Sequence, residues 1–221
     1  TGTCSEGVVG GVFIQVSILF VLYTRNLHTA LPATVNHQEF ADDIILDFSH
    51  PDLDFVGRTL TRAVTDISRW LEDIGLVMNA SKTQVMFVQP RGAAIATPDV
   101  FCNNEQLEVT ATAKYLGVIV DDQLSWRPHV DYVSRRTAQT IGQLWRHGRS
   151  LTLRARRSWY TSMVNSQLCY ASAAFYPSLT AQLLDRLGKI SKAGVRAVFQ
   201  LPRQTPTAPL ISRLNISPLI H

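Results

Sequence analysis

The sequence predicts an α+β fold followed by an all-helical region. Apolar residues flank an acidic turn at 40–43 as they do in β-hairpins, and they recur every three or four residues over 56–74 as they do in amphipathic helices. Helical periodicity resumes after Trp126 and dominates the rest of the chain. We therefore expect an antiparallel sheet with helices on one face within 1–126, and a basic helical region over 127–221.

The composition is that of a globular protein. The 221 residues are 46% hydrophobic and 17% charged, enough for one large domain or a domain with a subdomain. Cys4, Cys102 and Cys169 are far apart and lack metal-ligand spacing. We expect them to be buried thiols of an intracellular protein, nuclear or cytoplasmic and not secreted.

Charge is divided unevenly along the chain. Residues 1–126 carry 7 Lys/Arg and 15 Asp/Glu, a net charge of −8, whereas residues 127–221 carry 14 and 2, a net charge of +12. An acidic half that could collect metal is thus joined to a basic half that could hold a polyanion, which suggests nucleic acid. Two solvated faces without a partner are the alternative.

The uncharged stretch 7–24 has two interpretations. Its length is at the short limit for a membrane span, so a membrane-anchored protein is one of them. Glycines within it and the polar Gln15 and Ser17 favour the other, a Gly-rich loop leading into a buried helix, and we expect no membrane association. The chain begins with Thr1, and we interpret it as a fragment.

The acidic half contains clear turn and helix signals. Pro32 should close the first helix, and the acids of 40–43 should lie at the tip of a hairpin. The helix over 56–74 should end at Gly75 as a C-cap. Strand candidates follow at 84–88, at 100–109 as a hairpin turning at Asn103-Asn104, and at 114–120 with a glycine that permits a bulge.

The basic half should contain three helices and a tail. Apolar residues at helical spacing mark 130–144, 159–168 and 183–198. The residues from Pro202 onward are rich in proline, and we expect them to be irregular.

The tetrapeptide Phe40-Ala41-Asp42-Asp43 could carry chemistry. Carboxylate oxygens are the ligands that Mg²⁺ prefers, and paired metals can activate an attacking oxygen and stabilise a leaving one. A solvated Asp-Asp turn is the alternative. The same dipeptide recurs at Asp121-Asp122, which we expect to be an ordinary turn.

The tetrapeptide and its neighbours resemble, in order, the conserved boxes of reverse transcriptases of non-LTR, LINE-type retrotransposons. Phe40-Ala41-Asp42-Asp43 resembles the family's Tyr/Phe-Ala-Asp-Asp box. Residues 5–11 with 19–23 resemble the family's Gly loop and its following helix, and Gly75-Leu76, Asn79 and Lys82-Thr83 resemble its Gly-Leu…Asn…Lys-Thr box. Residues 114–118 resemble the strand that grips the primer, and Trp126 with His129 resembles the elements after that strand.

This resemblance implies a partial reverse-transcriptase palm, a thumb-like region and a set of site residues. Asp42 would bind catalytic Mg²⁺ (or Mn²⁺), with Asp43 nearer the outer sphere, and Lys82 would assist the departing pyrophosphate. Deoxynucleoside triphosphates would occupy a pocket, an RNA template and DNA primer would bind, and Leu116-Gly117 would approach the primer. The pocket would be lined by Gly7, Gly10, Gly11 and Phe40.

Without the resemblance, Lys82 would equally be a solvent-facing lysine, and Leu116-Gly117 would be a β-bulge.

Between Arg127 and Arg157 there are eight arginines and one acid. The segment resembles the thumb that follows the template-primer duplex, since phosphate contact needs positive charge without base reading. We expect Arg135, Arg136, Arg154 and Arg156 to make such contacts. Trp145 and Trp159 we interpret as core or interface anchors.

Two departures from the family pattern support an alternative function. The aspartate box that precedes the Gly loop in the family has no counterpart here, and Val9-Gly10 stand where the loop has Pro-Gln. The alternative is a catalytically inactive, nucleic-acid-binding relic of the same kind of element.

Overall fold

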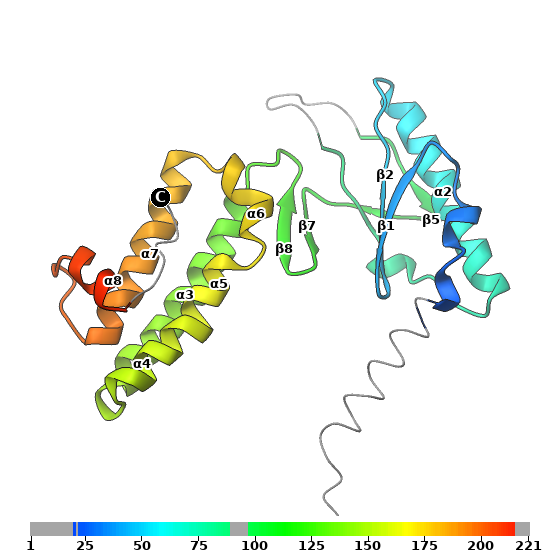
Figure 1. The fold of residues 1–221 in the computed structure, drawn as a ribbon. Helices are drawn as coiled ribbons and strands as arrows, with labels where there is room; N and C mark the ends of the chain where they lie inside the picture. Colours follow the sequence, from blue (N-terminus) through cyan, green and yellow to red (C-terminus); the bar gives the residue numbers. More distant parts are fainter. Residues whose placement is uncertain (1–19, 21, 89–96, 215–221) are drawn as a thin grey trace, which may run out of the picture. The chain divides into compact units, whose positions relative to one another are not determined.

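The computed structural model describes residues 20, 22–88 and 97–214. Within them the chain forms two compact units: the first comprises the described residues up to Phe87 and 97–110, and the second comprises Val88 and 111–214 (Figure 1). Gly7, Gly10 and Gly11, and most of the uncharged stretch 7–24, lie outside the described residues. Among the residues that are described, no helix is both long enough and apolar enough to cross a membrane.

Helix α2 (Leu53–Asp73) is the central helix of the first unit. Asp52 caps its start, because the carboxylate accepts hydrogen bonds from the backbone N–H groups of Asp54 (3.0 Å) and Phe55 (3.3 Å). At its end, Gly75 adopts φ 79° and the N–H of Leu76 donates to the carbonyl of Leu71 (2.8 Å). This is a Schellman C-cap, so the predicted helix and its glycine cap are confirmed.

The strands of the first unit pair two by two. Strands β1 (Asn36–Phe40) and β2 (Asp43–Asp47) are antiparallel, as are β4 (Phe101–Cys102) and β5 (Glu105–Gln106). Strands β3 (Gln84–Val85) and β6 (Glu108–Val109) are parallel.

The α+β class is confirmed, but the single antiparallel sheet expected from the sequence is not found among the described residues. The short strands instead pair two by two or bond to helix α2. The backbone N–H of Phe101, for example, donates to the hydroxyl of Thr61 on α2 (3.2 Å).

Two small clusters of buried residues attach these strands to α2. One cluster joins the helix to β3, β4 and the segment before β6, and includes Val56, Val64, Val85, Phe87, Val100, Cys102 and Leu107. The other joins the helix to the 3₁₀ turn Leu27–Ala30 through Leu27, Ile67 and Leu71. Ile44 and Leu46 of β2 pack against these clusters, which fixes the acidic hairpin on the unit.

The second unit begins with a hairpin, β7 (Thr112–Tyr115) and β8 (Val118–Asp121), and continues as helices. The helices share one core built mainly from their apolar faces. In chain order they are α3 (Arg127–His147), α4 (Leu153–Trp159), a π-helical turn (Tyr160–Asn165), α5 (Ser166–Cys169), α6 (Ser172–Phe175), α7 (Ala181–Phe199) and α8 (Ala208–Leu214).

Three sequence predictions for this unit need correction. The segment 114–120 is a hairpin and not one strand, because Leu116 and Gly117 both adopt positive φ. The tail after Pro202 contains α8, whose Leu210 and Leu214 are buried, because Pro209 lies in the first turn where a missing N–H has no cost. Cys102 is buried as expected, whereas Cys169 is exposed.

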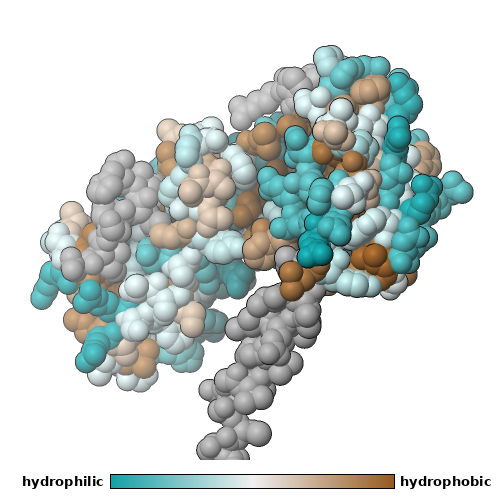
Figure 2. Space-filling view, turned by 45° about the vertical axis from the view of Figure 1, so that its right-hand side comes forward, coloured by the Kyte–Doolittle hydropathy of each residue, from teal (hydrophilic) through white to brown (hydrophobic). Residues whose placement is uncertain are grey.

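Large apolar side chains that remain exposed are spread over both units. Figure 2 shows on one face that the brown, apolar residues form small spots separated by teal and white ones. Polar and charged side chains therefore supply much of the surface available to a partner on that face.

Candidate functional site

The acidic tetrapeptide forms the tip of the β1-β2 hairpin, as predicted. Phe40 pairs with Asp43, so Ala41 and Asp42 are the two residues of the turn. Ala41 has φ 53°, a left-handed conformation that tight hairpins require. Asp42 and Asp43 are both exposed.

The register of the hairpin separates an apolar face from an open one. Side chains of paired residues lie on the same face of a sheet, and successive residues alternate between faces. Ile44 and Leu46 pack against the core, so Phe40 and Asp43 belong to the opposite face. Phe40 is 60% exposed. The hairpin thus presents an aromatic ring and a carboxylate to solvent on one face, next to the carboxylate of the turn.

These carboxylates fit a Mg²⁺ or Mn²⁺ site in chemistry and in accessibility. Mg²⁺ keeps several water ligands and is commonly held by one or two carboxylates together with substrate phosphates, which an exposed turn permits. Within the described residues, His, Cys, Asp and Glu do not gather in threes around any point where a metal could bind. Asp42 and Asp43 could therefore hold an ion only together with other ligands.

Lys82 lies in a short 3₁₀ turn (Ala80–Lys82) and is exposed. Asn79 organises this turn: its carbonyl accepts from the N–H of Lys82 (3.1 Å) and from the hydroxyl of Thr83 (3.0 Å). In the described part of the chain, no hydrogen bond or ion pair joins Lys82 to the acidic turn. The role in pyrophosphate release that the resemblance implies for Lys82 therefore stays a prediction.

Leu116 and Gly117 form the two-residue turn between β7 and β8. Their φ angles are 44° and 83°, as in a type I′ turn. Tyr170 holds this turn from the side of the helices. Its hydroxyl donates to the carbonyl of Leu116 (2.7 Å), and its ring would lie 3.3 Å from a Cβ added at Gly117. A larger residue at position 117 would be strained twice, by its φ and by the tyrosine.

The second Asp-Asp pair has a different environment. Asp121 is 6% exposed, and its carboxylate accepts from the backbone N–H groups of Ser125 (3.0 Å) and Trp126 (2.9 Å) just before α3. Burial acts to raise the pKa of Asp121, but hydrogen bonds from Ser125 and Trp126 outweigh it and hold the pKa below its ordinary value. Asp121 is thus a structural residue.

His129, in the first turns of α3, is also structural. It is 1% exposed, its Nδ1 accepts from the backbone N–H of Ile119 (3.2 Å), and its ring meets Phe175 edge-on with centroids 4.7 Å apart. Burial lowers the pKa of His129. The neutral imidazole therefore joins β8 to the helical core.

The four predicted phosphate-binding arginines differ in exposure. Arg135 and Arg136 on α3 and Arg154 on α4 are exposed, whereas Arg156 is half-buried. Its Nε is enclosed without a hydrogen-bond partner, and its Cδ lies 3.3 Å from where a Cβ on Gly148 would be. Arg156 therefore packs within the unit, whereas the other three arginines have exposed side chains.

Two cations lie beside Tyr132, a residue that we did not single out from the sequence. Arg136 Nη1 donates to the Tyr132 hydroxyl (3.0 Å), and Lys114 Nζ lies 5.4 Å from the centre of the tyrosine ring. The hydrogen bond from Arg136 and the charge of Lys114 lower the pKa of the Tyr132 hydroxyl. The one sequence signal was Tyr132 four residues before Arg136, one turn apart on the same side of a helix.

Comparison with known proteins identifies the family. Residues 7–120 match the family described as reverse transcriptase (RNA-dependent DNA polymerase). The chain belongs to the reverse transcriptase family. This match includes the acidic hairpin, Lys82 and the Leu116-Gly117 turn.

The chain is also similar to two curated proteins. The chain is 29% identical over 208 residues to a probable RNA-directed DNA polymerase from transposon BS of Drosophila melanogaster, covering 90% of this chain and 23% of the relative. It is 23% identical over 179 residues to a putative 115 kDa protein in the type-1 retrotransposable element R1DM of the same species, covering 80% and 17%.

These relatives confirm the predicted resemblance to retrotransposon reverse transcriptases. The chain spans less than a quarter of the length of each relative. No solved structure matches the chain.

Proposed function

We propose that this chain is the C-terminal part of the palm and a thumb-like region of a LINE-type RNA-directed DNA polymerase. The intact protein would extend the 3′-hydroxyl of a DNA primer on an RNA template with deoxynucleoside triphosphates. The observation that carries the proposal is the exposed Asp42-Asp43 turn within the span that matches the family.

In this proposal the acidic turn holds Mg²⁺ or Mn²⁺. Asp42 would be a direct ligand, with Asp43 nearer the outer sphere. When bound, the ions would supply positive charge that favours attack by the primer hydroxyl and stabilises the leaving oxygens. The apolar face of β2 matters because Ile44 and Leu46 anchor the turn on α2 and keep its carboxylates in one place.

The remaining residues bind and orient the substrates. Phe40, with Gly7, Gly10 and Gly11, would line the nucleotide pocket, and Lys82 would meet the departing pyrophosphate. The Leu116-Gly117 turn, held by Tyr170, would contact the primer end. Arg135, Arg136 and Arg154 would contact phosphates of the template-primer duplex, with Arg156 supporting them from within the fold.

Primer extension on an RNA template tests this proposal, in the intact element protein and in the 221-residue chain. Asp42→Asn should reduce Mg²⁺-dependent incorporation at least about 10²-fold, because a lost ligand removes several kcal/mol of charge stabilisation. Asp122→Asn is the matched control, since it changes the second Asp-Asp pair outside the proposed site. Equal activity of both variants in the intact protein would refute the assignment of Asp42.

A second candidate function is nucleic-acid binding without catalysis. It is favoured because, within the described residues, no third His, Cys, Asp or Glu joins Asp42 and Asp43 in a group that could hold a metal ion. The assay on the 221-residue chain alone separates the two. Incorporation that disappears in Asp42→Asn would exclude the inactive relic, whereas salt-sensitive hybrid binding without incorporation would support it.

A further inference from the structure

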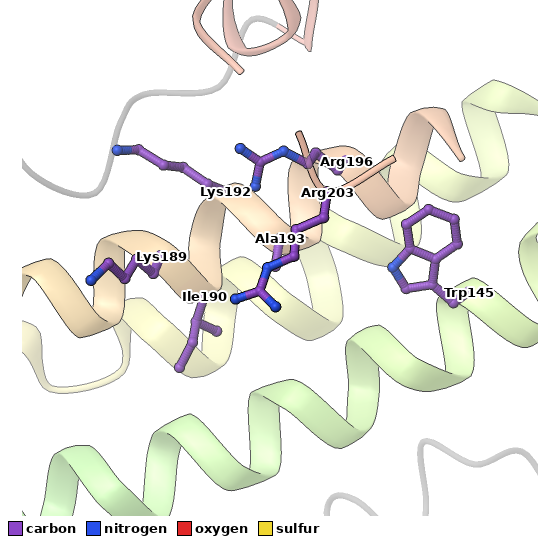
Figure 3. Close-up of a pocket in the computed structure, with 7 residues that line it drawn as sticks. All are labelled: Trp145, Lys189, Ile190, Lys192, Ala193, Arg196 and Arg203. Carbon is purple, nitrogen blue, oxygen red and sulfur yellow. The ribbon is translucent and has the colours of Figure 1, made fainter. Parts of the chain in front are cut away.

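A pocket in the helical unit combines an aromatic ring with positive charge and lacks acids among its lining residues. It has a volume of about 670 Å³ and lies between α3, α7 and the segment that follows α7. Figure 3 shows Trp145 projecting from α3, with its indole on the side of α7. The lining residues are Trp145, Lys189, Ile190, Lys192, Ala193, Arg196 and Arg203.

Trp145 is 38% exposed and is absent from the core of the unit, whereas Trp159 packs against that core. The sequence led us to expect both as core or interface anchors. Trp159 packs against the core as expected, whereas Trp145 lies outside it, and a role of Trp145 at an interface stays a prediction. A half-exposed indole in the wall of a pocket is free to stack on a flat ligand.

The cations form a row on one side of α7. Lys189, Lys192 and Arg196 recur at helical spacing, so they lie on one side of the helix over about 10 Å. Arg196 is oriented by a hydrogen bond from its Nε to the carbonyl of Thr205 (2.8 Å), which leaves its terminal nitrogens available.

The charges of this row are mostly unneutralised. Lys189 pairs with the exposed Asp185 (2.6 Å), but within the described residues Lys192, Arg196 and Arg203 have no ion-pair partner.

This pocket is on a different side of α3 from Arg136, one of the arginines proposed to contact the duplex. Trp145 follows Arg136 by nine residues, which is about two and a half helical turns, so the two side chains point in opposite directions from the helix axis. Trp145 in the pocket wall therefore points away from a duplex held at Arg136.

We infer that this pocket binds an unpaired nucleotide of a single nucleic-acid strand, with its base against Trp145 and its phosphates along Lys192, Arg196 and Arg203. Base stacking on an aromatic ring beside a row of cations is the usual way in which proteins hold single strands without reading sequence. A row of cations suits consecutive phosphates, whereas a free nucleotide would need one compact anion site. The inference takes from the proposed function only that the protein meets nucleic acid.

The test is binding of a fluorescent oligothymidylate of about eight nucleotides to the 221-residue chain, measured by anisotropy as a function of salt. Trp145→Ala should weaken binding about tenfold, and Trp145→Phe should retain most of the affinity because it keeps an aromatic ring. The double variant Lys192→Glu with Arg203→Glu should weaken binding and reduce the slope of log affinity against log salt by about 1.4.

Arg213→Glu is the matched control, because it changes an exposed charge on α8 that does not line the pocket. Unchanged thermal unfolding would show that the pocket variants fold. The inference is overturned if the Trp145 and Lys192/Arg203 variants bind the strand like the unchanged protein. It is also overturned if dTTP or polyglutamate of matched charge competes as well as the strand, since the site would then take free nucleotides or any polyanion.

The same experiment distinguishes failure of this inference from failure of the proposed function. Reversing Arg135 and Arg136 should weaken binding of an RNA-DNA hybrid and leave oligothymidylate binding nearly unchanged. If the arginine variants lose the hybrid while the pocket variants lose nothing, the inference fails and the proposed duplex contact stands. The reverse pattern would support the pocket and refute the duplex contact.

Discussion

The chain contains the dipeptide Asp-Asp twice, at an exposed hairpin turn and again at the entrance to a helix. Asp42 and Asp43 are open to solvent, whereas Asp121 is buried and accepts two backbone N–H groups. The same side chain is thus available for ligands in one place and committed to the fold in the other. The two hairpins differ likewise, because the tip of β7-β8 is held by Tyr170.

The largest expected effect on stability comes from Asp121. Asp121→Ala should lower the free energy of unfolding of the helical unit by about 2–4 kcal/mol, because it removes two charge-assisted hydrogen bonds and leaves their donors unpaired. Asp42→Ala should change it by less than about 0.5 kcal/mol, as is usual for exposed positions. Urea unfolding followed by circular dichroism measures both. Equal losses would remove the contrast between the two pairs.

Lowering the pH should destabilise the second unit in two steps, first through His129 and then through Asp121. The pKa of His129 is lowered in the folded state, so the unfolded chain takes up a proton first. The contribution of His129 to the free energy of unfolding is complete above about pH 6.5. It is lost as the pH falls below this value, by up to about 1.4 kcal/mol per pH unit. The pKa of Asp121 is also lowered, so its contribution is lost only below about pH 4.

Urea midpoints at pH 7.5, 6 and 5 would measure the histidine effect. His129→Gln provides an acceptor that does not titrate, so its stability should be flatter over this range. A wild-type protein with the same slope as the variant would show that His129 does not control this transition.

Tyr170→Phe tests the clamp on the second hairpin. Loss of the hydrogen bond to the carbonyl of Leu116 should reduce stability by about 1 kcal/mol while keeping the ring against Gly117. In the intact polymerase, the same variant should loosen the turn proposed to contact the primer and raise the KM for primer. A lower thermal midpoint with unchanged KM would separate the clamp from primer binding.

The smallest expected effect is at the acidic turn itself. Ala41 has a left-handed backbone conformation that costs an L-residue about 1–2 kcal/mol. Ala41→Gly should therefore stabilise the first unit by about 0.5–1 kcal/mol after the entropy cost of glycine. Thermal unfolding of this variant, compared with Gly75→Ala as the opposite change at a positive φ, would measure it. A destabilised Ala41→Gly protein would contradict the turn geometry.

Local patterns in the sequence were sufficient to predict the elements whose causes are local. The helix ending at Gly75, the acidic hairpin tip and the Asn103-Asn104 turn all depend on neighbours a few residues away. The clamp by Tyr170 depends on contact with a residue 54 positions away, which periodicity does not reveal.

The Trp145 pocket was missed for a similar reason. A tryptophan next to apolar residues at helical spacing is typical of a core position, and only the packing of α7 determines which side of α3 remains open. The roles of Asp42, Asp43 and Lys82 stay predictions that follow from the family resemblance.

The hydrogen bonds that Asp121 accepts also have a consequence for how the second unit opens. Its carboxylate belongs to β8 and its hydrogen-bond donors, Ser125 and Trp126, directly precede α3. His129 of α3 is also bonded to β8, through the N–H of Ile119. Neither element can separate from the other without breaking both connections. Amide hydrogens of β8 and of the first turns of α3 should therefore exchange with deuterium at one common rate, as a single opening event.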